Sequence, residues 1–122
     1  MKSSGGVSGP KFMLGAILRA ECDEVIPEYK FANERKFRAD YYVPELNLLV
    51  EYEGIYFAPD NGRGYTGASR HLNLKGYSTD CEKYNLAQIL GYKLLRYTAQ
   101  NYKQAVEDLR RLKRDLKVGG TD

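Results

Sequence analysis

The stretch from residue 38 to residue 54, RADYYVPELNLLVEYEG, constrains the fold most, because it reads as two strands joined by a short turn. RKFRADYYV (35–43) alternates well enough for a strand, LLVEYEG (48–54) reads as the second strand of the hairpin and is closed by Gly54, and PELN between them has turn composition. The stretch therefore predicts a β-hairpin within a sheet. Three acids, Asp40, Glu51 and Glu53, lie inside these strands, where a small protein normally places apolar side chains.

The flanking segments predict further elements by their periodicity. Apolar residues at helical spacing predict a helix over 11–22, and EVIPEYKF (24–31) predicts a short strand that Pro27 confines to an edge or a strand start. Residues 55–70 are rich in Gly, Asn and Asp and predict a long loop, and loops of that length are usually functional or disordered.

The last third of the chain predicts helix, strand and helix. A capping box at Ser78 or Thr79 predicts a helix start, with Leu86, Ile89 and Leu90 on its apolar side. YKLLRYT (92–98) predicts a strand, and residues 100–117 predict an amphipathic helix. The expected fold class is therefore α/β, a mixed sheet flanked by helices.

Length and composition limit the alternatives. A chain of 122 residues fits a single domain, which we place at 11–118 after a flexible Gly/Ser-rich tail at 1–10. Cys22 and Cys81 lie far apart and form no CxxC motif, so free thiols in a reducing compartment are the simplest interpretation. No apolar run is long enough to span a membrane. We expect a cytoplasmic protein without a membrane partner, and the net charge of +3 is compatible with nucleic-acid binding without requiring it.

The three acids suggest a metal site. Glu51 and Glu53 share one face of their strand, and a hairpin brings Asp40 opposite or diagonal to them. Like charges so close repel unless a cation lies among them or they take up protons, and hard oxygen ligands suit Mg²⁺ or Mn²⁺. The alternative is a solvated strand face that carries ordinary surface acids.

FRADYYVPELNLLVEYEG, together with SRH, GYSTDCEKYN and GYKLLRYT, resembles the core of the PD-(D/E)XK nuclease superfamily, above all its very-short-patch-repair-like and phage-encoded branches. The likeness covers about residues 28–98. It implies a restriction-endonuclease-like αβββαβ core and a Mg²⁺- or Mn²⁺-dependent endonuclease that hydrolyses DNA. Phage or prophage DNA processing, recombination or repair would be its setting, in a bacterial or phage-infected host cell.

The resemblance implies roles for single residues. Asp40 becomes a metal ligand and Glu51 the acid of the (D/E)XK element, but Glu53 stands where the family's simplest form has Lys. Either Glu53 is an additional metal ligand, or the missing cation comes from elsewhere. Lys83, in the predicted helix that follows, is the candidate for that cation. The alternative for Lys83 is a solvated helix lysine.

Two further residues are candidates on the same resemblance. Glu28 corresponds to an upstream acid that completes the metal site, with Glu21 and Glu24 as weaker rivals. His71 corresponds to a histidine that assists proton transfer, and a pKa near neutrality suits that role. It lies further from the acidic strand than in the compact repair enzymes, and a single histidine is often only structural or exposed.

The expected partner is DNA, and no feature of the sequence excludes RNA. Basic and aromatic residues are interleaved through the motif region and could hold a phosphate backbone. A homodimer is a further expectation, because two active sites are needed to cut two strands. Two rivals remain: a catalytically inactive nucleic-acid-binding module and an α/β interaction protein whose acids all lie on the surface. The predicted nucleic-acid contacts are Arg38, Arg63, Arg70 and Lys75.

Overall fold

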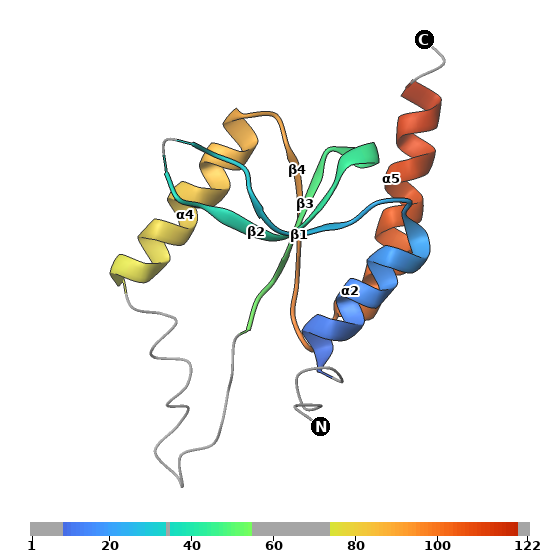
Figure 1. The fold of residues 1–122 in the computed structure, drawn as a ribbon, viewed down its shortest axis with the longest axis horizontal. Coiled ribbons are helices and arrows are strands. Elements are labelled where there is room, and N and C mark those ends of the chain that lie inside the picture. The colour runs from blue at the N-terminus through green and yellow to red at the C-terminus, as the bar shows by residue number, and fades with distance from the viewer. Residues whose placement is uncertain (1–8, 34, 55–73, 120–122) are drawn as a thin grey trace, which may run out of the picture.

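A computed structural model describes residues 9–33, 35–54 and 74–119, which form three layers (Figure 1). The middle layer is a four-stranded sheet in the order β1-β2-β3-β4. Helix α4 (Leu74–Ile89) covers one face, and helices α2 (Pro10–Glu21) and α5 (Ala105–Gly119) cover the other. The predicted α/β class, a mixed sheet flanked by helices, is confirmed. None of the helices within these ranges is both long and apolar enough to cross a bilayer.

The strands follow the predicted order and include the predicted hairpin. The strands are β1 (Ile26–Lys30), β2 (Arg38–Val43), β3 (Leu48–Tyr52) and β4 (Lys93–Tyr97). Strand β2 pairs antiparallel with both β1 and β3, and β4 pairs parallel with β3. The 3₁₀ turn η1 (Pro44–Leu46) connects the hairpin strands. It ends at Asn47, whose φ of 50° is a left-handed conformation that Asn tolerates better than most residues.

Two apolar clusters hold the layers together. Strand β3 begins with three buried apolar residues in a row, as expected for a strand that is covered on both faces. The larger cluster joins the sheet to α2 and α5, and the smaller one lies on the α4 side. The larger cluster includes Leu14, Leu18, Val43, Leu48, Val50, Tyr97 and Leu109; the smaller one consists of Phe31, Ala32, Ala39, Leu49 and Ala87.

The start of α4 differs from the prediction. The capping box at Ser78 or Thr79 is wrong, because α4 already begins at Leu74. The Thr79 hydroxyl instead donates a hydrogen bond to the Lys75 carbonyl one turn earlier, a common arrangement for threonine inside a helix. Gly91, with a φ of 91°, follows the helix in the left-handed conformation that glycine commonly adopts after a helix end.

Two details of the helical predictions also change. Ile89 and Leu90 are 78% and 46% exposed, so the predicted apolar side of α4 is wrong at these positions, and Ala87 is the buried residue there. The last helix begins at Ala105, after the 3₁₀ turn η2 (Tyr102–Gln104), rather than at residue 100. The predicted tail and the predicted loop at 55–70 lie outside the described residues, apart from the last two positions of the tail.

Candidate functional site

Asp40 and Glu51 lie on the two interior strands of the sheet, near enough for the negative charge of Asp40 to act on Glu51. The paired residues of β2 and β3 end at Tyr41 and Val50, and Asp40 and Glu51 are the next positions along the two strands. Oδ2 of Asp40 accepts a hydrogen bond of 2.7 Å from the backbone N–H of Tyr52. This bond fixes the orientation of the Asp40 carboxylate and leaves Oδ1 to meet a cation.

Glu51 is the most unusual acid of the described residues, because it is only 7% exposed. Nζ of Lys83 lies 2.9 Å from its Oε2, and both side chains are largely buried. Although this is an ion-pair distance, Oε2 accepts no hydrogen bond of ordinary geometry from any described residue. We treat Lys83 as an electrostatic partner, because attraction between opposite charges does not require a particular angle.

The surroundings of Glu51 favour its protonated form. Burial raises the pKa of Glu51 to about 7, since a charged carboxylate loses hydration in the interior. Lys83 opposes this rise, whereas the negative charges of Asp40 and Glu53 add to it. The predicted like charges therefore add to the raised pKa of Glu51, whose main cause is burial, and a perturbed carboxyl group is a common property of functional sites.

Glu53 is held by a different set of groups. The Tyr84 hydroxyl and Nε of Arg96 both donate to its Oε2, at 2.8 and 2.9 Å. The Arg96 guanidinium also lies over the Tyr84 ring, 3.9 Å from its centroid. Burial, followed by the hydrogen bond to Glu53, raises the pKa of the Tyr84 hydroxyl, so that it remains a donor. The Glu53 carboxylate is thus held in place by two hydrogen-bond donors.

Lys11, from the first turn of α2, links Asp40 to Glu28. Its Nζ lies 3.2 Å from Oδ1 of Asp40 and 3.7 Å from Oε2 of Glu28. Burial alone lowers the pKa of Lys11, but its hydrogen bond with Asp40 and the nearby negative charges raise it overall. Glu28 lies in β1, between the residues that pair with Tyr41 and Ala39 on either side of Asp40. Its φ of 52° is rare for a residue other than glycine and typical of strained functional positions.

The rivals of Glu28 lie elsewhere. Glu21 forms an ion pair of 3.0 Å with Arg110 of α5, and Glu24 is exposed, with its backbone N–H bonded to Glu45. Of the three upstream acids, only Glu28 shares a described cation with Asp40.

The predicted nucleic-acid contacts are only partly placed. Arg38, at the start of β2, and Lys75, in the first turn of α4, are both exposed to solvent. His71, Arg63 and Arg70 lie outside the described residues. Their roles stay predictions.

The sequence analysis missed Lys11 and Tyr84. Both contact the acids only because segments far apart in the sequence pack together. The local spacing of residues therefore does not predict these contacts. The strand-like run of the β4 segment offered a signal for Arg96, because parallel pairing of β4 with β3 places Arg96 beside Glu51 in the register.

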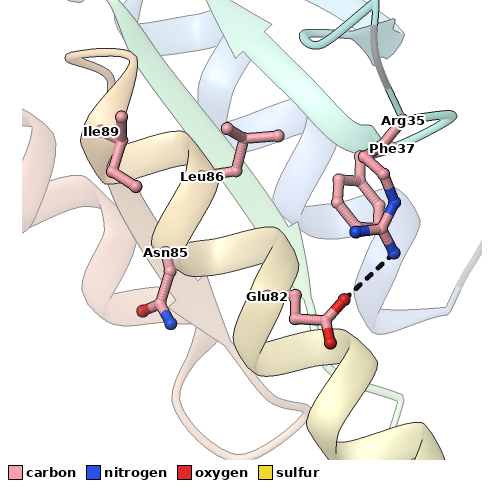
Figure 2. Close-up of a pocket in the computed structure, with 6 residues that line it drawn as sticks. All are labelled: Arg35, Phe37, Glu82, Asn85, Leu86 and Ile89. Carbon is pink, nitrogen blue, oxygen red and sulfur yellow. Dashed lines mark ion pairs between the residues drawn. The ribbon is translucent and has the colours of Figure 1, made fainter.

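A pocket of about 370 Å³ lies on a different surface of α4 (Figure 2). Its rim is crossed by an ion pair of 3.1 Å between Arg35 and Glu82. None of the candidate metal ligands contributes to its lining, which consists of Arg35, Phe37, Glu82, Asn85, Leu86 and Ile89. The pocket is therefore separate from the acidic site.

Asp40 and Glu51 are the candidate ligands for a hard divalent ion. Within the described ranges, no group of three or more His, Cys, Asp or Glu side chains is gathered closely enough to hold a metal. However, Mg²⁺ commonly uses one or two carboxylates and completes its shell with waters and substrate phosphates. Asp40 and Glu51 supply two such groups, and Glu51 contributes a buried oxygen that lacks a hydrogen bond.

Comparison of the chain with models of protein families, with curated proteins and with solved structures finds no match.

Proposed function

We propose that the protein is a Mg²⁺- or Mn²⁺-dependent endonuclease that hydrolyses phosphodiester bonds of DNA. The observation that supports this proposal best is the buried Glu51, next to Asp40 and in contact with Lys83. The order of elements in the described chain, α2-β1-β2-β3-α4-β4, also agrees with the αβββαβ core expected from the resemblance.

Asp40 and Glu51 would hold the metal. A divalent metal bound by them would polarise the phosphate and lower the pKa of a bound water. The Tyr52 N–H keeps the Asp40 carboxylate oriented, and the position of Glu51 on an interior strand limits the movement of the second carboxylate. These contacts set the geometry before the substrate arrives.

Lys83 supplies the positive charge that the lysine of the (D/E)XK element, replaced here by Glu53, would provide. Its ammonium lies beside Glu51 on the α4 side of the sheet and can stabilise negative charge on a nearby phosphate. Glu53, fixed by Tyr84 and Arg96, keeps a negative charge near Glu51 and thereby tunes that carboxyl. Arg38 and Lys75 would contact the DNA backbone, and His71 would move a proton.

A cleavage assay tests the proposal. Labelled single strands, duplex, flap, four-way junction and RNA are incubated with the protein in Mg²⁺, Mn²⁺ or EDTA. We expect metal-dependent cutting of a DNA substrate that Asp40→Asn, Glu51→Gln and Lys83→Met each reduce strongly. The matched control is Glu107→Gln, at an exposed acid of α5, which should leave cutting unchanged. Unchanged cutting by the Asp40→Asn protein would refute the assignment.

One observation favours the rival, an inactive nucleic-acid-binding module. Each of the four acids has a basic partner in the described structure: Lys11 for Glu28 and Asp40, Lys83 for Glu51, and Arg96 for Glu53. Carboxylates neutralised in this way do not need a metal to be stable together. The rival predicts salt-sensitive DNA binding without turnover in any of the metals.

A further inference from the structure

Lys11 occupies the oxygen of Asp40 that a metal would need. Oδ2 of Asp40 is committed to the backbone N–H of Tyr52, and Lys11 Nζ lies against the other oxygen, Oδ1. The same ammonium approaches Glu28, which the resemblance also assigns to the metal. A cation supplied by the chain therefore already lies where a divalent ion would bind Asp40.

Lys11 and Lys83 differ in their freedom to leave. The Lys83 side chain is 18% exposed, whereas the Lys11 side chain is 48% exposed. The Lys11 backbone is anchored, since its carbonyl accepts a hydrogen bond of 3.1 Å from the Tyr41 hydroxyl. The flexible stem of a half-exposed lysine can move its ammonium into water while the backbone stays in place. Of the two lysines, Lys11 is the one that can exchange with a metal.

We propose that Lys11 is the built-in counter-ion of the metal site: its ammonium and a divalent metal bind Asp40 alternately and exclude each other. This inference rests on the proposed function, because it takes Asp40 as a metal ligand. Lys11 acts through the carboxylates and is a positioning residue. It keeps Asp40 and Glu28 together when no metal is bound and withdraws when a metal enters.

Titration calorimetry of metal-stripped protein with Mn²⁺ alone tests this exclusion. Lys11→Met keeps most of the side-chain length and removes the competing charge, so we expect its Kd for Mn²⁺ to fall by about tenfold or more. Lys11→Arg keeps the charge and should stay near the wild-type Kd. Lys36→Met makes the same charge change at an exposed lysine that has no ion pair among the described residues. Because salt screens distant charges, it should alter Kd by less than about twofold.

The outcomes separate this inference from the proposed function. Tighter binding by Lys11→Met alone supports the exclusion. Equal or weaker binding by Lys11→Met, with Mn²⁺ still bound by the wild type, overturns the role of Lys11 and leaves the metal site standing. No binding by either protein at millimolar Mn²⁺ overturns both the exclusion and the metal-dependent function. Circular dichroism of each variant confirms that it is folded, as expected for substitutions of exposed side chains.

Discussion

Replacing Glu51 by Gln in metal-free buffer should remove a pH dependence of stability that the burial of this carboxyl gives the wild type. The Glu51 carboxyl has a pKa of about 7 in the folded protein, raised from an ordinary 4.5. Between these two values the folded state binds more protons than the unfolded state, so the wild type loses stability as pH rises through this window. A gap of about 2.5 pKa units, at about 1.4 kcal/mol for each unit, amounts to about 3 kcal/mol.

Gln resembles the protonated Glu51 carboxyl in shape and charge, which makes the comparison clean. Near pH 4.5 the two proteins should be similarly stable, because Lys83 lacks a charged partner in both. Toward pH 8 the Glu51→Gln protein should become the more stable by up to about 3 kcal/mol, since only the wild type must bury a carboxylate.

The assay is urea unfolding of both proteins in EDTA at several pH values from about 4.5 to about 8.5. Glu107→Gln, at an exposed acid, is the control and should show a flat difference from the wild type. The reasoning fails if the stability difference between wild type and Glu51→Gln is also flat. It fails equally if the wild type gains on the variant as pH rises, because the Lys83 ion pair would then outweigh burial.

Four further substitutions test the core by urea unfolding. Leu48→Ala, at a fully buried position, should lower the free energy of unfolding by about 2–5 kcal/mol. Leu116→Ala, at a half-exposed position, should lower it by less than about 1 kcal/mol. Similar losses in the two variants would contradict the assigned core. Tyr97→Phe removes a buried hydroxyl that donates to a carboxylate of α5 and should cost about 1–2 kcal/mol; no loss would mean that this bond contributes nothing. Gly15→Val should cost at least about 1–3 kcal/mol, because even a Cβ there would lie 2.6 Å from the Tyr41 hydroxyl oxygen, and a neutral effect would contradict this close packing.

The sequence predicted the elements whose signals are local. The hairpin was predictable because turn residues at 44–47 separate two strand-like runs, and its register follows once one face of each strand is buried. The neighbouring positions of Asp40 and Glu51, one residue beyond the last pair of this register, follow from it as well. The contact between Lys83 and Glu51 was expected only through the resemblance.

The start of α4 was mispredicted for a physical reason. Ser78 and Thr79 favour N-caps, but their hydroxyls can also bond to the preceding helical turn, and Gly76 weakened the helical signal of the segment before them. Lys11 could not be predicted, because its contact with Asp40 depends on how α2 packs across the sheet. Contacts of this kind are fixed by tertiary packing and leave no local periodicity.

Some acids and bases of the site lie in parts of the fold that differ in the free energy of local opening. Asp40 and Glu51 sit on interior strands, whereas Arg96 comes from an edge strand and Lys11 from the first turn of a helix. Amide hydrogens of interior strands exchange with solvent only through larger openings, whereas edges and helix ends fray at lower free energy. Asp40 and Glu51 are thus the least mobile part of the site, and Lys11 and Arg96 belong to the parts that open more readily. Substitutions that loosen the periphery should alter how the basic groups are presented well before they displace the acids.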